Sequence, residues 1–315
     1  MIVTLTANPS LDRAITLQGA LRPGQVQSAA SSREDAGGKG INVARAVDAA
    51  GVVAVAVLPL AADDPFDAAL RGSGLTARRV PVDGNVRANL TITDPAGVTT
   101  KLNLPGATLD TAERASLIDA VVAECGGARW LVLAGSLPPG AGSDFYVDVI
   151  RAVRAAHGDK APLIAVDTSG RALREVVAAA TPDLIKPNDE ELAELAGAEL
   201  DGGGDLAGEM LRVARTLVPD RTRAALVTLG PHGAVLITAG GAWHAGAPRV
   251  QVVSTVGAGD SSLAGYLLAE VEGAPPEERL RRAVRYGAAA ASLPGTQAPT
   301  PQDLPTGEVP VFRLT

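Results

Sequence analysis

Short apolar runs alternate with amphipathic segments along most of this chain. The apolar runs are typical of buried strands, and we predict strands at residues 2–6, 52–58, 130–134, 163–167, 184–186, 225–229, 234–238 and 250–253. Between many of them apolar residues recur at helical spacing, which predicts helices at residues 40–50, 109–125, 144–156 and 190–196. This alternation predicts a three-layer α/β fold (αβα), in which helices cover both faces of a mostly parallel central sheet.

Two segments, residues 12–35 and 84–105, lack helical periodicity and are predicted to form β-structure. A small sheet inserted in an α/β domain is an arrangement expected of a lid over an active site. We therefore expect residues 1–315 to form a single domain that carries a β-sheet lid. The run Gly202-Gly203-Gly204 predicts a flexible loop.

The second of these segments has a polar face. Arg87 and Asn89 alternate with apolar residues before an Asp-Pro-Ala-Gly turn, and Lys101 and Asn103 alternate with them after it. A period of two places alternate side chains on one face of a strand, and the tetrapeptide suits a hairpin turn. The four side chains form either an ordinary solvated face or a cationic, amide-rich surface above a site.

Composition narrows the function classes. Hydrophobic residues make up 46% of the chain and aromatic residues 3%, so a globular protein with an aliphatic core is expected. The net charge is -7 and no Lys/Arg-rich run occurs, which argues against nucleic acid as a partner. No apolar run is long enough to span a membrane, and no basic leader precedes the first strand, so we expect a soluble, cytoplasmic protein. The single cysteine, Cys125, excludes an intrachain disulfide and is interpreted as a buried small residue.

The segment Ser254-Thr-Val-Gly257-Ala-Gly259-Asp260-Ser-Ser262 carries the strongest chemical signal. It places two glycines and a carboxylate where a predicted strand leads into a helical pattern. The N–H groups at a helix start attract anions, and glycine lets a phosphate approach the backbone closely. A carboxylate beside such a cradle would repel the phosphate unless it handles a proton on the attacking group. The segment therefore favours phosphoryl transfer.

Two other interpretations of this segment remain open at this point. Asp260 is also a favoured type of capping residue for an ordinary helix start. The pair Gly257 and Gly259 also nearly fits a dinucleotide-binding fingerprint. That motif, however, has Gly or Ala where this chain has Ser262, and it lies at the first βα turn of its fold.

Further polar motifs follow predicted strands. The run Gly37-Gly38-Lys39-Gly40 opens a helix and could grip a phosphate or sugar hydroxyls, although it lacks the Ser/Thr of a Walker A loop. Asp12, after the first strand, either accepts hydrogen bonds from sugar hydroxyls or only forms a turn.

Asn188 and Glu191 are spaced as in a helix capping box, but their oxygens could also hold the waters of a magnesium ion. The glycine-rich turn at residues 228–233 follows a strand and suits the close approach of a nucleotide. The rigid turn at residues 134–140 lies at another strand end.

Six motifs, in order, resemble those of the ribokinase-like (phosphofructokinase B) family of sugar kinases. They are Asn8-Pro9-Ser10-Leu11-Asp12, the run from Gly37 to Ala44, the run from Ala134 to Pro138, Lys186-Pro187-Asn188 with Glu191, Thr228-Leu229-Gly230, and the run from Ser254 to Ser261. The resemblance extends from end to end. It is strongest to the bacterial 1-phosphofructokinase branch, with the tagatose-6-phosphate kinase branch close by.

The resemblance implies roles for individual residues. Asp260 would be the catalytic base, and the N–H groups of Gly257, Ala258 and Gly259 would form the anion hole. The sugar phosphate would contact Asp12, Gly38, Lys39 and Asn42, and Arg87, Asn89 and Lys101 would reach it from the lid. ATP would be surrounded by Lys186, Asn188, Thr228, Gly230, Gly233 and Ser254. Mg²⁺ would be supported through water by Asn188 and Glu191. Some relatives also bind K⁺, here near Val250 and residues 291–295.

The implied reaction is ATP-dependent phosphorylation of a ketohexose phosphate. The cations Lys39, Arg87 and Lys101 favour a substrate that already carries a phosphate, because a neutral sugar needs no such charge. By resemblance, Lys39 favours fructose 1-phosphate, which would become fructose 1,6-bisphosphate. Tagatose-6-phosphate kinase, 6-phosphofructokinase and a catalytically inactive sugar-phosphate sensor are the alternatives. A homodimer is one assembly that we consider. We also expect a low pKa for the Asp260 carboxyl group, because it lies at a helix N-terminus.

Overall fold

The computed structural model describes residues 1–200 and 204–315, so Gly202 and Gly203 of the predicted glycine loop lie outside the described residues. Its central sheet has ten strands in the order β14-β13-β12-β11-β10-β9-β8-β1-β4-β5. The parallel strands are β5 (Ala77–Pro81), β4 (Ala54–Leu60), β1 (Ile2–Leu5), β8 (Trp130–Ala134), β9 (Leu163–Asp167), β10 (Leu184–Ile185) and β11 (Ala224–Thr228). The sheet ends in antiparallel β12 (Ala234–Thr238), β13 (Gly241–Ala245) and β14 (Val311–Leu314).

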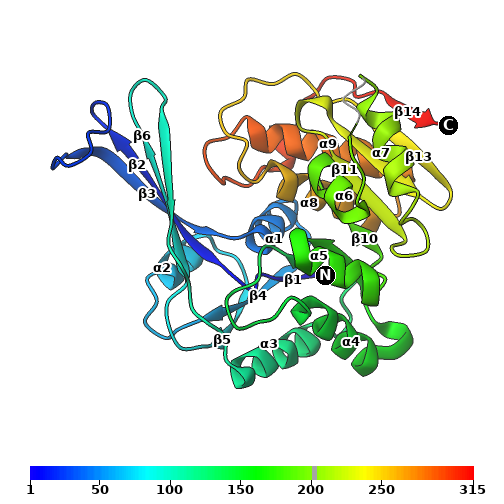
Figure 1. Cartoon of the computed structure of the whole chain (residues 1–315), viewed down its shortest axis with the longest axis horizontal. Coiled ribbons are helices and arrows are strands. Elements are labelled where there is room, and N and C mark those ends of the chain that lie inside the picture. Colours follow the sequence, from blue (N-terminus) through cyan, green and yellow to red (C-terminus); the bar gives the residue numbers. More distant parts are fainter. Residues whose placement is uncertain (201–203) are drawn as a thin grey trace.

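Helices cover both faces of this sheet (Figure 1). One layer holds α3 (Thr111–Glu124), α4 (Phe145–His157), α5 (Gly170–Ala179), α6 (Asp189–Ala196) and α7 (Leu206–Ala214). The other holds α1 (Lys39–Ala49), α2 (Phe66–Gly72), α8 (Ala258–Val271) and α9 (Pro276–Ala291). Successive side chains of a strand point to opposite faces, so Ile2 packs in one core and Val3 and Leu5 in the other. The predicted three-layer fold is confirmed.

The two segments predicted to form a lid build a separate four-stranded sheet, called the lid from here on, in the order β3 (Ala29–Gly37), β2 (Ser10–Leu17), β6 (Arg87–Thr93) and β7 (Thr99–Asn103). Figure 1 shows its strands projecting away from the α/β body. Asn89 lies opposite Asn103, and Thr91 opposite Lys101. The polar residues of β6 and β7 therefore share one face of the lid, as their alternation predicts.

The predicted strand at residues 250–253 is wrong. The structure has no strand there, and Val252 and Val253 are 62% and 57% exposed. A strand needs a partner for its backbone, but this end of the sheet is completed by the three antiparallel strands. Instead, the Val253 N–H donates a hydrogen bond to the carbonyl of Ala291, at the end of α9, at 2.8 Å. A loop, rather than a strand, therefore leads into α8.

The other predicted elements occur within about two residues of their predicted bounds. In the described part of the chain, no helix is both long and apolar enough to cross a membrane.

Candidate active site

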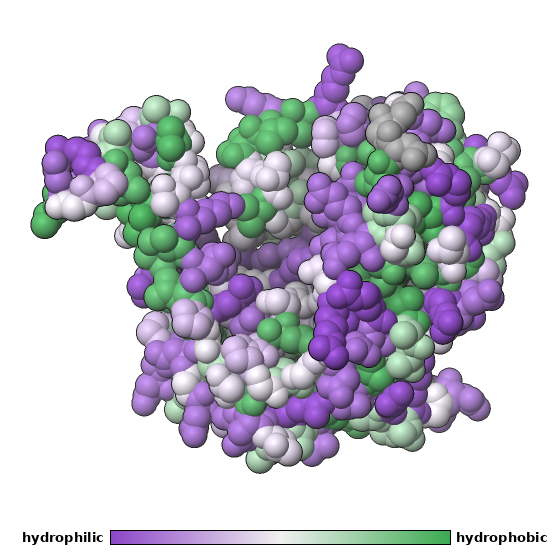
Figure 2. Space-filling view, viewed as in Figure 1, coloured by the Kyte–Doolittle hydropathy of each residue, from purple (hydrophilic) through white to green (hydrophobic). Residues whose placement is uncertain are grey.

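An open cleft of about 370 Å³ lies between the lid and the carboxyl ends of the central strands. Figure 2 shows this face of the molecule hollowed between lid and body. The cleft is lined by Ser10, Asp12, Gly38, Lys39, Asn42, Arg87, Asn89, Lys186, Asn188, Glu191, Thr228, Val256, Gly257, Gly259, Asp260 and Thr296. Thirteen of these sixteen residues are predicted site residues, and Ser10, Val256 and Thr296 are additions.

The start of α8 presents a buried carboxylate to the cleft. Gly257 has a φ of 78°, a left-handed conformation that glycine adopts without strain, and it turns the chain into the helix. Asp260 is 6% exposed, and its Oδ2 accepts a hydrogen bond from the Asn42 amide at 2.8 Å. The first intrahelical bond of α8 runs from the Ser261 N–H to the Gly257 carbonyl, so the N–H groups of Gly259 and Asp260 have no acceptor within the helix. Together they form a cradle for an anion.

The environment of Asp260 changes its acidity. Burial and the nearby Asp167 carboxylate raise the pKa of Asp260 to about 6, although the Asn42 hydrogen bond and the ammonium groups of Lys39 and Lys186 lower it. The expectation of a low pKa is therefore wrong. A helix dipole contributes only about 0.3–1 kcal/mol, and burial of a charge can cost several times as much.

Asp167 holds two lysines beside this carboxylate. It ends β9 with no exposed surface, and its oxygens lie 2.8 Å from Lys39 Nζ and 3.2 Å from Lys186 Nζ. Burial alone would raise the pKa of Asp167, but the two ammonium groups outweigh it and lower that pKa. Burial alone would lower the pKa of Lys39, but Asp167 raises it above its usual value.

Asp167 is a residue that the sequence analysis missed. The available signal was an aspartate at the last position of the apolar strand predicted at residues 163–167. In open parallel sheets, ligands bind at the carboxyl ends of strands, so a charged residue at such a position marks a candidate.

The lid side of the cleft holds a second carboxylate, Asp12. Its Oδ1 accepts hydrogen bonds from the Ser10 hydroxyl and the Asn89 amide, each at 2.8 Å. Burial raises the pKa of Asp12, although these two bonds and the Arg87 charge lower it. A Cβ at Gly37 would lie 2.1 Å from the Asp12 Oδ2, so a larger residue at this position would displace the Asp12 carboxylate.

Several polar atoms of the cleft lack partners within the described residues. The side-chain oxygens Asn42 Oδ1, Asn89 Oδ1 and Thr296 Oγ1 are shielded from solvent and accept no hydrogen bond. Buried polar atoms in native proteins are usually paired. Their residues line the cleft, so its wall contains unsatisfied acceptors that a bound molecule with hydroxyl groups could reach if the side chains turn.

Asn188 and Glu191 form a capping box at the start of α6. Asn188 Oδ1 accepts from the Glu191 N–H at 2.7 Å, and the Asn188 N–H donates to Glu191 Oε2 at 2.9 Å. Across residues 1–200 and 204–315, no group of three or more His, Cys, Asp or Glu side chains could hold a metal ion. Mg²⁺ binds through few carboxylates, with waters and phosphate oxygens supplying the rest, and Glu191 at the cleft rim fits that mode.

The remaining predicted site residues do not line the cleft. Gly230 and Gly233 close the β11–β12 turn, where a side chain at Gly233 would lie 1.9 Å from the Ala245 carbonyl oxygen. The Ser254 hydroxyl donates to the Gly295 carbonyl at 3.2 Å, which ties the loop before α8 to the loop after α9. The Ala258 N–H points to the Thr255 carbonyl at 3.4 Å. Lys101 is exposed on β7.

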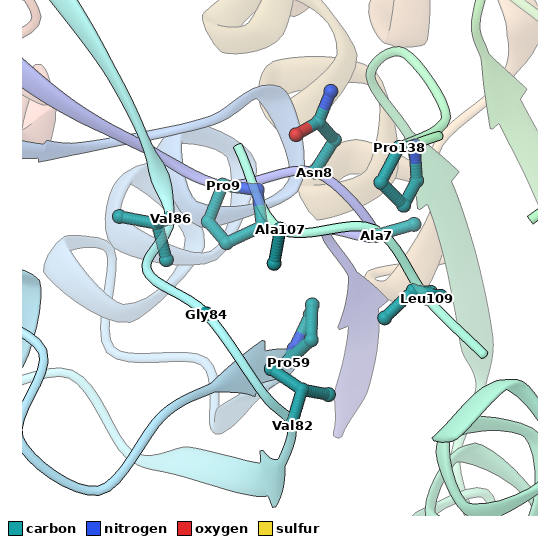
Figure 3. Close-up of a pocket in the computed structure, with 10 residues that line it drawn as sticks. All are labelled: Ala7, Asn8, Pro9, Pro59, Val82, Gly84, Val86, Ala107, Leu109 and Pro138. Atoms are coloured by element: carbon teal, nitrogen blue, oxygen red, sulfur yellow. The ribbon is translucent and has the colours of Figure 1, made fainter. Parts of the chain in front are cut away.

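A second pocket lies beneath the base of the lid (Figure 3). Its space is only about 10 Å³, and its walls are mostly apolar side chains such as Pro59, Val82 and Leu109. The Asn8 amide points away from Pro59 and Val82. The pocket is too small for a sugar or a nucleotide, and the open cleft remains the candidate site.

Comparison with known proteins assigns the chain to a protein family. Residues 6–303 match the pfkB family of carbohydrate kinases. The chain belongs to that family. This pfkB kinase is 33% identical to a 1-phosphofructokinase of Rhodobacter capsulatus, over 96% of this chain and 94% of the relative. It is 32% identical to the ATP-dependent 6-phosphofructokinase isozyme 2 of Mycobacterium tuberculosis (strain ATCC 25618 / H37Rv), over 94% and 86%.

Among solved structures, the pfkB kinase is similar to phosphofructokinase-2 from Escherichia coli in complex with potassium. The TM-score is 0.85 at 31% identity, and the match covers 96% of each chain. The predicted family and the predicted enzyme class, a phosphotransferase acting on a carbohydrate, are thereby confirmed.

Proposed function

We propose that this kinase transfers the terminal phosphoryl group of ATP to fructose 1-phosphate, giving fructose 1,6-bisphosphate. The observation that carries the proposal is the buried Asp260 carboxylate, which shares the cleft with free helix-start N–H groups and two lysines. Such a set suits phosphoryl transfer, which needs positioning and charge neutralisation more than covalent chemistry. The similarity to a 1-phosphofructokinase supports the choice of acceptor.

In the proposed reaction, Asp260 is the base. With a pKa of about 6 it is mostly ionised at neutral pH, and it takes the proton of the sugar C6 hydroxyl as that oxygen attacks phosphorus. The new P–O bond forms to C6 while the bond to ADP breaks. The N–H groups of Gly257, Gly259 and Asp260 hold the transferred group, and that of Ala258 joins them by turning away from the Thr255 carbonyl. Lys39 and Lys186 balance the charge of the group.

The sugar phosphate is proposed to lie on the lid side of the cleft. Asp12 and the unpaired Asn42 and Asn89 oxygens accept hydrogen bonds from its hydroxyls, next to the backbone of Gly38. The Arg87 guanidinium group binds the phosphate of the sugar. Lys101 shares that face of the lid but does not line the cleft, so its contribution is long-range attraction.

The nucleotide is proposed to lie on the opposite side, near Lys186, Asn188, Thr228, Gly230, Gly233 and Ser254. Glu191 and Asn188 would hold Mg²⁺ through water, and the ion would neutralise charge on the phosphate oxygens. The proposed K⁺ neighbourhood lies around Val250 and residues 291–295, and near it the N–H groups of Val253 and Ser254 donate to the Ala291 carbonyl at the end of α9.

Fructose 6-phosphate is the second candidate acceptor. It is favoured by the similarity to the 6-phosphofructokinase isozyme 2 and to the fold of phosphofructokinase-2. Tagatose 6-phosphate is a further ketohexose phosphate of the same size and charge. An inactive sugar-phosphate sensor would have no need for a base, but Asp260 and its cradle are present.

One assay separates these candidates. ADP release is measured with wild type and Asp260→Asn across fructose 1-phosphate, fructose 6-phosphate, tagatose 6-phosphate and unphosphorylated fructose. We expect the highest kcat/KM with fructose 1-phosphate. A higher value with either 6-phosphate would reassign the substrate, and a wild-type protein that binds these sugars without turnover would be a sensor. The homodimer stays a prediction that sedimentation velocity can test.

A further inference from the structure

A cavity of about 310 Å³ lies at the other end of α8, away from the catalytic cleft. Its lining includes Leu268 of α8, Glu272 just after that helix, and Arg282, Arg285 and Tyr286 of α9. Asp260 is in the first turn of α8, so at 1.5 Å per residue roughly 18 Å of helix separates it from Glu272. The cavity and the cleft are therefore distinct sites.

Arg285 brings an uncompensated charge to this cavity. Its Nη2 donates to the Gly307 carbonyl at 2.9 Å, but its Nε is shielded from solvent and has no acceptor. Within the described residues, Arg285 makes no salt bridge. The other guanidinium at the cavity is balanced, because Arg282 lies 2.7 Å from the Glu272 carboxylate. The second lining glutamate, Glu278, is paired with Arg281. One positive charge is thus left over.

The Tyr286 hydroxyl is a second unused donor. The residue is 2% exposed and lines the cavity, and its hydroxyl makes no hydrogen bond to any described residue. Arg282 and Tyr286 are four positions apart on α9, and Arg285 is three positions beyond Arg282. Such spacings place side chains on one face of a helix. The donors therefore converge on the same space.

We propose that this cavity binds a small organic anion. The Arg285 guanidinium and the Tyr286 hydroxyl supply donors that match a carboxylate or phosphate oxygen. Leu268 and Leu304 supply an apolar wall for the rest of the molecule, and the volume is in the range of small-molecule sites. Glu272 and Glu278 lie at the same cavity, so they select against anions of high charge. The site takes a singly or doubly charged metabolite.

Isothermal titration calorimetry of the full chain tests the site with two probes, glycerol 2-phosphate and succinate. We expect one probe to bind with one-to-one stoichiometry, and its identity tells a phosphate site from a carboxylate site. Tyr286→Phe removes only an unbonded hydroxyl, so it should fold normally and weaken binding roughly threefold to tenfold. Arg285→Met should weaken it at least tenfold.

Two control variants locate the binding. Arg171→Met removes an exposed arginine of α5 and should leave the affinity unchanged. Lys39→Ala alters the catalytic cleft and should also leave it unchanged. The proposal is overturned if neither probe binds wild type at millimolar concentration, if binding survives both Tyr286→Phe and Arg285→Met, or if Lys39→Ala abolishes it. These results do not depend on turnover, so they stand apart from the proposed kinase reaction.

Discussion

The two walls of the cleft each present a carboxylate, but they are built differently. On the body, Asp260 and Asp167 are buried, and the lysines that pair with Asp167 come from a helix start and from the end of a neighbouring strand. On the lid, Asp12 is only partly buried, and its partners Ser10 and Asn89 belong to the same four-stranded sheet.

This difference separates chemistry from recognition. The body wall rests on two large hydrophobic cores, so its charged groups are held in fixed geometry. The lid buries few side chains, since no residue of β6 is fully buried and most of β7 is exposed. Elements with little buried surface open at low cost, and a closing lid excludes water from a site. We infer that the body performs the transfer and the lid selects and covers the sugar.

The largest expected effect comes from the body wall. Asp260→Asn should lower kcat by roughly 10²–10⁴-fold, the loss typical of a missing general base, while ATP still binds. Steady-state ADP release and a nucleotide titration measure the two quantities. If kcat of the Asn variant lies within a few-fold of the wild-type value, Asp260 is not the base, and the proposed catalytic difference between the two walls is lost.

The same variant should not lose stability. Because the pKa of Asp260 is raised in the folded state, its contribution to stability is fully present below pH 3.8 and is lost as the pH rises through about 6. Asn resembles the protonated form and carries no buried charge. At pH 8 the free energy of unfolding of Asp260→Asn should therefore equal or exceed that of wild type. A less stable variant would show that the hydrogen bond from Asn42 outweighs the cost of burying the charge.

Asp167→Asn should weaken both function and stability. It leaves the Lys186 ammonium, which is 5% exposed, without a counterion, and breaking a buried pair in this way costs about 3–5 kcal/mol. Displaced lysines should lower kcat on the order of 10²-fold. Urea unfolding and steady-state kinetics measure the two effects.

Asp183→Asn is the matched control, because Asp183 pairs with Arg223 outside the cleft. It should lower stability without lowering kcat. If both variants lower kcat equally, Asp167 acts only through the stability of the fold.

Much of this arrangement could be predicted from the sequence. The spacing of apolar residues predicted the three layers of the fold, because each strand and each helix buries its own apolar positions. The convergence of Asp12, Lys39, Asn188 and Asp260 on one cleft could be predicted because all four lie near strand ends or helix starts. In a parallel sheet those ends meet at one edge, so residues far apart in sequence converge there.

What could not be predicted depends on partners that are distant in sequence. The valines at residues 250–253 have strand propensity, but only the finished sheet shows that no neighbour remains for them. The acidity of Asp260 is set by burial and by Asp167, which lies on another strand. Lys101 lies on the same face of the lid as Asn89 but does not line the cleft. Strand alternation predicts the face of a side chain, but it does not tell how far along a strand the cleft extends.

The lid wall is tested by comparing its two cations. Arg87 lines the cleft and Lys101 does not, so Arg87→Met should raise KM for the phosphorylated sugar roughly tenfold to a hundredfold, the value of a charged hydrogen bond. Lys101→Met should change it by less than about threefold, as for an exposed charge. Neither should change kcat by as much as Asp260→Asn. Equal effects on KM would extend the sugar site along β7.

The dependence of kcat and KM on pH reports on both walls at once. The base must be ionised, so kcat should fall about tenfold for each unit below pH 6, where Asp260 becomes protonated. Burial also raises the pKa of Asp12, but that residue is proposed to bind the sugar rather than to move the proton, so its protonation should raise KM rather than lower kcat. In Asp260→Asn, the fall in kcat at low pH should disappear, while the rise in KM at low pH remains. If the fall in kcat persists in that variant, another group carries the proton and the division between the two walls fails.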